Sequence, residues 1–545
     1  MSISEINLLK NKIEIELSDG SRFHTIDGFR KRWFYDSYMH ILFSMTWEEN
    51  EGNHDAEIKL IKRILEQKDE VAPFVAKKKC VVMVNTSNRC NLSCSYCFRG
   101  RNKSSLADIE TVKKSLDFVF HRYRPNADEY VISYSMTSES SVDLGLLKHI
   151  AEEYIKYEDY RFCLQDMNFE FLEEFCVKLS EDFSDVPKNL SAQDNGASLV
   201  VFLNSLLEKR NLYDILHLSP ENFSMADNRE IGRRDFISKW RLFRLNRWCL
   251  ESVYAKFVKR RKNPYIGFWF MTNGTCANRN FIDFVKACVI NPLLVSIDGP
   301  ESVHNYNRKY SDGNASYSDI VKNLEVFLRN GIILNASAVI TDFFPKPLEI
   351  VRHLVSLNFS AVTMIPVRPG YGCSFNENNV SILLHGYDEL YSEFKTGALK
   401  GDFSLFRILR SDLSLAAFNI FLDRTKLLKR CDFDEQIVID CDGSVYPCVY
   451  FVGHPEFCWG NVGEGIAKFG TADGILVNQR GECASCWARY LCGGTCFYGA
   501  QVTSGYFRNT EPVECLLKRH LAEKCLELLI FLTEKNVDLS KIYQE

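Results

Sequence analysis

The sequence lacks any long hydrophobic run. No stretch of about 18 uncharged apolar residues occurs among its 545 residues, so we expect no membrane-spanning helix and no membrane partner. Residues 1–19 contain no short apolar segment that ends in small residues, which predicts the absence of a secretory signal. Together these two absences predict a cytoplasmic protein.

A strong charge imbalance is also missing. Lys and Arg number 66 and Asp and Glu number 71, which gives a net charge of −5. So mild a balance argues against a protein built as a whole to bind nucleic acid or anionic membranes. Internal repeats and low-complexity segments are absent too. The 46% apolar and 25% charged residues are typical of a folded globular chain and exclude a disordered or fibrous one.

Cysteine is abundant instead, with 20 residues. In a reducing compartment many cysteines indicate metal or redox chemistry rather than disulfides. Their distribution agrees, because Cys90, Cys94 and Cys97 form one tight group and most of the others lie at residue 431 or beyond. A disulfide scaffold would spread them through a short secreted domain. For the scattered ones we expect small buried apolar side chains, namely Cys80, Cys163, Cys176, Cys249, Cys276, Cys288, Cys373 and Cys525.

Chain length predicts three or four domains. Residues 1–75 are typical of a small α+β module, because the alternating segment 12–17, the turn signal Ser18-Asp19-Gly20 and the segment 22–25 favour a hairpin. A helical pattern follows over 56–67. The alternative for this region is an N-terminal extension that packs on the next domain.

Short apolar runs alternate with amphipathic stretches over residues 80–370. This order is typical of an α/β fold with a parallel sheet and helices outside it. Six units predict a partial (β/α)6 TIM-like barrel, whose active site would form at the carboxyl ends of the strands. The expected strands are Val81–Asn85, Tyr130–Tyr134, Ile266–Met271, Leu293–Ile297, Leu334–Ile340 and Val362–Pro366, and the expected helices are Ile109–Tyr123, Phe281–Val289, Ile320–Arg329 and Pro347–Leu357.

The strands at 130–134 and 266–271 lie much further apart than the ~30 residues of a βαβ connection. We therefore predict a mostly helical insertion within 155–260. Its second half is basic and aromatic, which suits an anionic peptide or nucleic acid, whereas a solvated helix face is the simpler alternative. Beyond the barrel we expect bridging helices over 371–430, a cysteine-rich domain over 431–516 and a C-terminal helix over 517–545.

The first cysteine group, Cys90-x₃-Cys94-x₂-Cys97, directly follows a predicted strand. Thiolates bind iron–sulfur clusters, and cubane clusters usually take four. Three thiolates from one loop leave one iron open to a substrate or cofactor if no fourth cysteine joins them. A structural zinc site with a distant fourth ligand is the alternative.

The second group extends from Cys431 to Cys515. Between Ile437–Ile439 and Val445–Tyr446, the turn Asp442-Gly443 predicts a hairpin that holds cysteines close together. A zinc ribbon is the alternative for the two CxxC-like pairs. The cysteines of the series are Cys431, Cys448, Cys483, Cys486, Cys492, Cys496 and Cys515.

Residues 88–98, Asn-Arg-Cys-Asn-Leu-Ser-Cys-Ser-Tyr-Cys-Phe, resemble the signature of the radical S-adenosylmethionine superfamily. The resemblance implies that Cys90, Cys94 and Cys97 are the catalytic cluster ligands and that Tyr96 and Phe98 line the cofactor site. In that family the open iron chelates S-adenosylmethionine. One electron then cleaves it to methionine and a 5′-deoxyadenosyl radical, which abstracts hydrogen from the substrate.

Three further strand ends resemble the same family. Thr137-Ser138-Glu139 stands where the family carries Gly-Gly-Glu, and the missing glycines depart from the pattern, because glycine permits a closer backbone approach. Thr272-Asn273-Gly274 and Ser296-Ile297-Asp298-Gly299-Pro300 match more fully, and His304 and Arg308 follow the latter. Glu139 would receive the ammonium, Ser296 the ribose or carboxylate, and Arg308 the carboxylate. The implied cofactor contacts are Ser138, Glu139, Asn273, Ser296, Asp298 and Arg308.

The C-terminal series resembles the SPASM extension of these enzymes, which implies two auxiliary [4Fe–4S] clusters and three clusters in total. The outer cluster would use Cys483, Cys486, Cys492 and Cys515. The inner one would use Cys431, Cys448 and Cys496, with Cys441, Cys458 or a substrate thiolate as the remaining ligand.

Enzymes of this type mostly modify peptides. The resemblance favours a maturase that installs a crosslink, by analogy a cysteine thioether, in a ribosomally made, cysteine-containing precursor peptide with a leader. It also implies a flavodoxin- or ferredoxin-type electron donor and leader capture by the N-terminal module through an added strand. In sulfatase-maturing members, the residue directly after the cysteine that matches Cys448 is an Asp that serves as the catalytic base. Val449 stands there and cannot accept a proton.

The sequence leaves other functions open. They are carbon–carbon crosslinking or another oxidation of a peptide, a radical reaction on a small molecule, and a non-catalytic iron–sulfur scaffold. The insertion could cover the active site or hold the core peptide.

Overall fold

The computed structural model describes residues 23–27, 32–36, 41–45, 79–85, 87–98, 106–123, 129–134, 139, 265–287, 292–423, 425–429, 431, 436–466 and 476–542. The predicted insertion 155–260, the predicted strand 12–17 and the predicted helix 56–67 lie outside these residues, as do Thr137 and Ser138.

Ten strands form one large sheet in the order β13-β12-β11-β10-β4-β5-β6-β7-β8-β9. The strands from β4 to β9 pair in parallel with their neighbours. This confirms the predicted α/β fold and all six predicted strands, with ends shifted by one or two residues. Their bounds are β4 Lys79–Val84, β5 Glu129–Tyr134, β6 Tyr265–Thr272, β7 Leu293–Ser296, β8 Leu334–Ile340 and β9 Ala361–Pro366.

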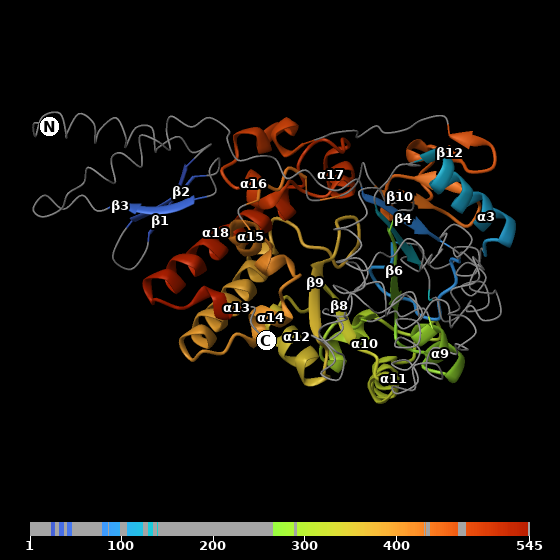
Figure 1. The fold of residues 1–545 in the computed structure, drawn as a ribbon, viewed down its shortest axis with the longest axis horizontal. Helices are drawn as coiled ribbons and strands as arrows, with labels where there is room; N and C mark the ends of the chain where they lie inside the picture. The colour runs from blue at the N-terminus through green and yellow to red at the C-terminus, as the bar shows by residue number, and fades with distance from the viewer. Residues whose placement is uncertain are drawn as a thin grey trace, which may run out of the picture.

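Helices cover one face of this sheet, with α9 to α12 lying together beside β8 and β9 (Figure 1). In β8, Leu334, Ala336, Ala338 and Ile340 are buried and alternate with less buried residues. Because successive strand side chains point to opposite faces, this alternation separates a packed face from a face open to a site. The four predicted helices are present, as α3 Ile109–Asp117 continued by the π-helical segment η1 Phe118–Tyr123, α9 Arg279–Ala287, α11 Tyr317–Arg329 and α12 Pro347–Ser356.

The predicted hairpin around Asp442-Gly443 is present, and it also extends the main sheet. Strands β10 (Gln436–Ile439) and β11 (Ser444–Tyr446) pair antiparallel. Gly443 adopts φ +83°, a conformation that favours glycine. On its other edge β10 pairs in parallel with β4, the strand that precedes Cys90. The cysteine-rich region and the barrel strands therefore share one sheet. Strands β12 (Gly460–Asn461) and β13 (Gly465–Ile466) continue it.

C-terminal helices pack into the same hydrophobic core as the sheet. Within that core the Tyr391 hydroxyl donates to the carbonyl of Ser414 and lies 3.2 Å from the Cys525 sulfur. The last long helix, α18, starts at Pro512, inside the predicted cysteine-rich domain, so Cys515 lies in its first turn. The helices of this region are α13 Val380–Leu399, α14 Ser404–Ile408, α15 Leu413–Leu422, α16 Arg489–Cys492, α17 Phe497–Ser504 and α18 Pro512–Glu534.

Near the N-terminus, a separate three-stranded antiparallel sheet contains β1 (Phe23–Asp27), β2 (Arg32–Asp36) and β3 (Ile41–Met45). The predicted strand at 22–25 thus exists, and it pairs with β2. The His24 ring stacks on Trp487 at 3.7 Å, and Tyr35 meets the same indole edge-on. These contacts attach the small sheet to the cysteine-rich region, beside α16 (Figure 1).

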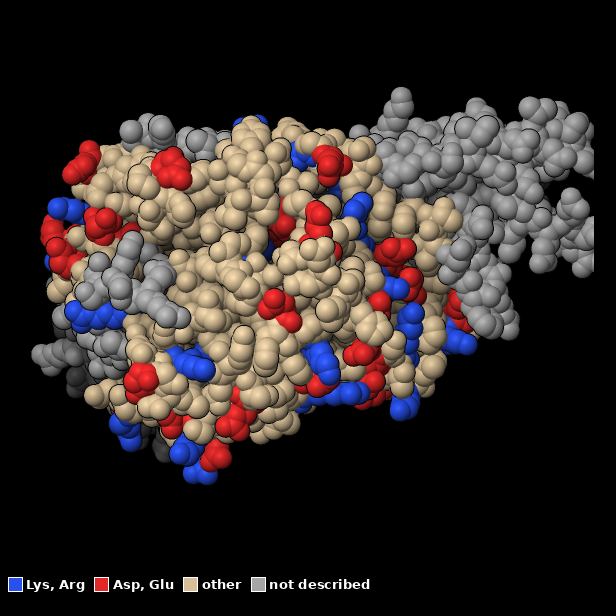
Figure 2. All heavy atoms as spheres, turned by 180° about the vertical axis from the view of Figure 1, so that it is seen from behind, with Lys and Arg blue, Asp and Glu red and all other residues tan. Residues whose placement is uncertain are grey.

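Among the described residues, no helix has both the length and the apolar composition needed to cross a membrane. On the face drawn in Figure 2, basic and acidic side chains are interspersed around a broad uncharged area.

Gly386 of α13 touches the start of α12. A Cβ there would lie 2.4 Å from the Pro345 carbonyl oxygen. Alanine gains about 1 kcal/mol of helix propensity, but that oxygen cannot retreat without displacing α12. We therefore expect Gly386→Ala to lower the free energy of unfolding by about 1–3 kcal/mol, measured by urea denaturation. Gly372→Ala is the control, because its Cβ would meet nothing within 4 Å. Equal midpoints for the two variants would contradict the prediction.

Candidate functional site

The Cys90–Cys97 loop follows β4 and is held by the chain that follows α10 (Glu301–Asn307). The Ser93 amide donates to the carbonyl of Lys309 at 2.7 Å, and the Ser95 amide donates to that of Asn307 at 2.9 Å. Cys90 and Cys97 are exposed and Cys94 is half-buried. The backbone of the loop is thus anchored to the chain at the end of α10.

These three thiols lie close enough to influence one another. Although Cys90 is exposed as a whole residue, the loss of water around its sulfur raises the pKa of the thiol, and the nearby Glu139 and Cys97 raise it further. Burial also raises the pKa of Cys94 to about 12, against the opposing effect of Arg308. Buried thiols of this kind become thiolates when they bind a metal, because the cation offsets the cost of the charge.

Across the described residues, no three Cys, His, Asp or Glu side chains converge closely enough to share a single metal ion. A four-iron cluster bridges its thiolates through several metal atoms, so it requires wider spacing than a single ion does. Cys90, Cys94 and Cys97 are free cysteines of one loop, and thiolates are the residue type that holds a [4Fe–4S] cluster.

Glu139 lies at the end of β5, next to Cys90, and its side chain is buried. Its carboxylate accepts hydrogen bonds from the Thr272 hydroxyl at 2.7 Å and from the Asn273 amide at 2.5 Å. The Asn273 side-chain amide lies 3.8 Å from the Cys90 sulfur. The structure therefore brings together three predicted site residues from β5, β6 and the cysteine loop.

Asp298 is fully buried beyond β7. Its carboxylate accepts hydrogen bonds from the Tyr96 hydroxyl, from Arg308 Nε at 3.1 Å and from the Val339 amide at 3.0 Å. The Arg308 guanidinium also lies 5.3 Å from the centre of the Tyr96 ring. The three predicted cofactor contacts Tyr96, Asp298 and Arg308 thus form one buried cluster, in which Asp298 positions the other two.

Ser296 ends β7 and is buried, and it points to the face of the sheet opposite to that of Leu293 and Val295. It pairs with Ser337, in the middle of β8, in the sheet register. Two serines therefore lie in register on neighbouring strands.

The C-terminal cysteines divide into two groups. Cys483, Cys486, Cys492 and Cys515 form one electrostatic group. Burial is the main cause that raises the pKa of Cys483, and the other three cysteines raise it further. Cys492 also raises the pKa of Cys486 and of Cys515. Cys431, Cys448 and Cys496 pack around Phe451, Phe497 and Tyr498. This division is the one that the SPASM resemblance implies.

The two candidate ligands for the inner group's remaining position lie in other surroundings. Cys441 is buried in the main core. The Cys458 thiol donates to the Gly460 carbonyl at 3.4 Å, and Cys458 packs with Met83 and Tyr446. Val449 is buried in that same cluster, so an apolar side chain follows Cys448 here.

Aromatic contacts connect the first loop with the inner group. Phe98, a predicted cofactor contact, lies 4.7 Å from Tyr450, and Tyr450 stacks on Tyr498 at 5.1 Å. Burial raises the pKa of Tyr450 to about 12, while Arg368 opposes that rise.

Sequence reasoning missed Tyr450, Arg368 and Glu514. Arg368 stands just beyond β9, so the rule that polar residues at strand ends form the site would have selected it. Glu514 carries no such signal, because its position depends on where α18 begins. Of the scattered cysteines, Cys525 is buried as expected, whereas Cys276 and Cys373 are half-buried. Cys80, in β4, has no described side chain, and the remaining four lie outside the described residues.

His304 is fully buried and contacts the backbone of Asp298. Nδ1 faces the Asp298 amide at 3.3 Å and Nε2 faces the Ser316 hydroxyl at 3.1 Å. Burial lowers the pKa of His304 to about 4. The neutral ring accepts at Nδ1, and protonation would abolish that contact.

We expect His304 to make folding pH-dependent. Its pKa falls from 6.5 to about 4 on folding, so its stabilising effect is complete above pH 6.5 and is lost as the pH falls toward 4. The loss is roughly 3 kcal/mol at most, at about 1.4 kcal/mol per pKa unit. The melting temperature of His304→Gln should therefore change less with pH than that of the wild type between pH 6.5 and about 4. His385→Gln, at an exposed surface histidine, should match wild type. If the melting temperatures of all three proteins changed equally with pH, this prediction for His304 would be wrong.

No protein-family model matches the sequence. The chain is 24% identical over 279 residues to the serine-type anaerobic sulfatase-maturating enzyme of Bacteroides thetaiotaomicron, which covers 45% of this chain and 65% of that enzyme. It is 26% identical over 261 residues to the cysteine-type enzyme of Clostridium perfringens, which covers 43% and 65%. The matches thus span just under two thirds of these relatives' length.

A longer match joins the chain to the radical SAM cyclopropyl synthase TigE of Paramaledivibacter caminithermalis, with 20% identity over 350 residues, 61% of this chain and 67% of that protein. In fold, the chain resembles native anSMEcpe with bound AdoMet, at a TM-score of 0.53 and 16% identity, over 84% of this chain and 99% of that one. The chain is thus a distant relative of the anaerobic sulfatase-maturating enzymes and of a radical SAM cyclopropyl synthase.

Proposed function

We propose that the chain is a peptide maturase that reductively cleaves S-adenosylmethionine, removes hydrogen from a ribosomally made precursor peptide and installs a crosslink. The observation that carries this proposal is the joining of two cysteine groups by one sheet. Strand β4 leads into Cys90, and β10, paired with it, leads through β11 to Cys448. A substrate held between the two groups would meet both.

At the first site, Cys90, Cys94 and Cys97 would hold the cluster that binds S-adenosylmethionine. When bound and reduced, that cluster supplies the electron for reductive cleavage of the cofactor, the reaction that starts radical chemistry. Glu139, which Thr272 and Asn273 hold beside Cys90, would accept the cofactor's ammonium. Arg308, which Asp298 holds near Cys94, would receive its carboxylate.

The remaining assigned contacts complete the cofactor pocket. Ser296 would bond the ribose or carboxylate, while Tyr96 and Phe98 would line the pocket. Ser138 lies outside the described residues and stays a prediction. The sheet from β4 to β9 would curve as a partial (β/α)6 barrel around this pocket, flanked by the module at 1–75, the insertion at 155–260, the bridging helices at 371–430 and the cysteine-rich domain at 431–516.

Two auxiliary clusters would handle the surplus electron. Crosslinking removes two hydrogens from the peptide, one as an atom and one as a proton plus an electron. Cys431, Cys448 and Cys496 lie nearest the aromatic contacts from the first loop, so the inner group is the proposed acceptor. The outer group, Cys483, Cys486, Cys492 and Cys515, would pass the electron to a flavodoxin- or ferredoxin-type partner.

A cysteine thioether is the proposed bond, by analogy. Carbon–carbon closure, or a reaction on a small molecule, are the alternatives. The peptide's leader would add a strand to the β1–β3 sheet, which is attached to the cysteine-rich region through His24 and Tyr35.

A second candidate is sulfatase maturation, which the names of two relatives favour. Val449 argues against it, because a buried valine offers no proton acceptor beside Cys448. Incubation with a sulfatase-derived peptide that carries Cys or Ser decides between the two. Aldehyde formation would favour this second candidate.

Iron content and cofactor cleavage test the enzyme class. We expect about 12 Fe per chain in anaerobically reconstituted protein, and about 8 in the Cys90→Ala/Cys94→Ala/Cys97→Ala variant, which should release no 5′-deoxyadenosine. Zinc in place of iron, or full cleavage by the triple variant, would overturn the proposal.

Glu139→Gln should keep its iron yet bind S-adenosylmethionine roughly ten- to a hundredfold more weakly, because a hydrogen bond to a charged group contributes about 1.5–3 kcal/mol. Isothermal titration on the unreduced protein measures this. Glu301→Gln, at an exposed position in α10, is the control. Unchanged binding by Glu139→Gln would remove this residue from the cofactor site.

The bond type is tested by mass spectrometry of a cysteine-containing precursor peptide that the enzyme has modified. Both crosslinks remove about 2 Da, the mass of the two hydrogens, but a thioether consumes the cysteine thiol. We expect the product to resist iodoacetamide. A product that loses this mass and still alkylates would indicate carbon–carbon closure.

A further inference from the structure

Arg368 follows β9 by two residues, at the same end of the sheet as the other site residues. Its side chain is mostly buried, with 25% of its surface exposed. The Nε atom is wholly buried and has no hydrogen-bond partner among the described residues. A buried, charged donor without a partner calls for a physical explanation, since it carries a desolvation cost.

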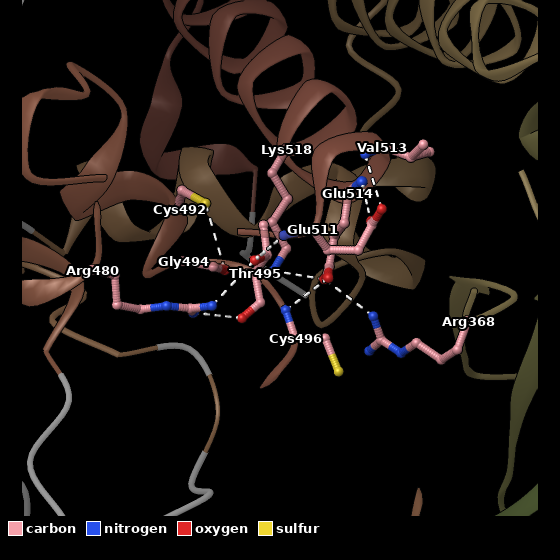
Figure 3. A network of polar contacts seen from close by, with 10 residues as sticks. All are labelled: Arg368, Arg480, Cys492, Gly494, Thr495, Cys496, Glu511, Val513, Glu514 and Lys518. Atoms are coloured by element: carbon pink, nitrogen blue, oxygen red, sulfur yellow. Dashed lines mark hydrogen bonds and ion pairs between the residues drawn. The ribbon is translucent and has the colours of Figure 1, made fainter. Parts of the chain in front are cut away.

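The opposite side of the guanidinium is occupied. Arg368 Nη1 donates to Glu514 Oε1 at 3.1 Å, and Lys518 Nζ donates to the same oxygen at 2.8 Å. The other oxygen of Glu514 accepts the Cys496 amide at 2.7 Å, so Glu514 lies between Arg368 and the backbone of a proposed cluster ligand (Figure 3). Burial alone would raise the pKa of Glu514, but Lys518 and Arg368 outweigh it and hold that pKa far below its ordinary value.

The charges of this network do not cancel. Arg480 donates to the Thr495 carbonyl at 2.6 Å, and Glu511 accepts the amides of Val513 and Glu514 (Figure 3). The network therefore holds three cations and two carboxylates, which leaves at least one positive charge in excess. Arg368 and Lys518 share the single carboxylate of Glu514, which cannot neutralise both cations.

Arg368 acts on the inner cysteine group. Burial by itself would lower the pKa of Arg368, yet Cys496 and Glu514 raise it well above its ordinary value. Burial raises the pKa of Cys448 to about 12, and Arg368 opposes that rise. An arginine keeps its charge at every accessible pH, so its field on these two cysteines is permanent.

A positive charge beside an iron–sulfur cluster stabilises the reduced state, which carries one more negative charge, and hydrogen bonds to cluster sulfurs act in the same direction. We propose that Arg368 is a positioning residue that raises the reduction potential of the inner cluster at Cys448 and Cys496, making it the acceptor of the electron released by the substrate. This inference rests on the proposed function, because it requires that cluster.

The test is a redox titration of the full chain, followed by electron paramagnetic resonance. The Cys90→Ala/Cys94→Ala/Cys97→Ala background leaves only the two auxiliary clusters. The reference is the midpoint potential of each cluster in this background without a further substitution. At that potential, adding Arg368→Gln should lower the ratio of reduced to oxidised cluster at least threefold for one cluster. This corresponds to a midpoint potential about 28 mV lower, at about 59 mV per tenfold change in the ratio. Arg368→Lys should retain most of the potential. Arg352→Gln, which removes an equal charge from a surface pair with Glu393, should change nothing.

Glu514→Gln supplies a measurement of opposite sign. It keeps the side-chain shape and removes the negative charge, so the ratio for the same cluster should rise. This variant decides the matter if Arg368→Gln fails to load about 8 Fe per chain. If Arg368→Gln loads its iron, an unchanged ratio of reduced to oxidised cluster would overturn the inference. If it does not, an unchanged ratio in Glu514→Gln would overturn it. An equal shift in Arg352→Gln would also overturn it. If the background protein itself holds no auxiliary iron, the proposed function fails together with it.

Discussion

A buried carboxylate, Asp298, is the constraint on which the first site depends. A charge without solvent is tolerated only when it is paired and hydrogen-bonded. Asp298 meets this condition with Arg308, the Tyr96 hydroxyl and the Val339 amide, which come from the chain after α10, the cysteine loop and β8. Satisfying one charge therefore fixes three segments relative to β7, and His304 fixes the Asp298 backbone from the other side.

A second charged side chain, Glu514, joins separate segments in the same way at the inner cysteine group. It joins Arg368, which follows the last barrel strand, to Lys518 in α18 and to the backbone of Cys496. The inner cysteine group is thus tied to the barrel through an ion pair as well as through the pairing of β10 with β4. Two independent connections keep the distance between the two cysteine groups constant, which a reaction shared between them requires.

At one position, Val449, the chain does not fit the chemistry that the names of its relatives suggest. The relatives include sulfatase-maturating enzymes, yet Val449 is packed among Met83, Val438 and Tyr446. An ionised side chain could not occupy that apolar cluster without a large desolvation cost. The names of these relatives therefore do not by themselves indicate the reaction of this chain, since activity depends on the site rather than on the fold.

The parallel α/β sheet, its six strands and the hairpin at Asp442-Gly443 could be predicted from the sequence alone. Local periodicity and turn chemistry specify such elements, and strand ends of a parallel sheet meet at one edge by geometry. Long-range packing, in contrast, pairs β10 with β4, bonds Asp298 to Arg308 and Tyr96, and brings Arg368 and Glu514 beside Cys496. These contacts join residues that are far apart in the chain, and the partner of a buried charge is chosen by packing, which leaves no periodic trace in the sequence.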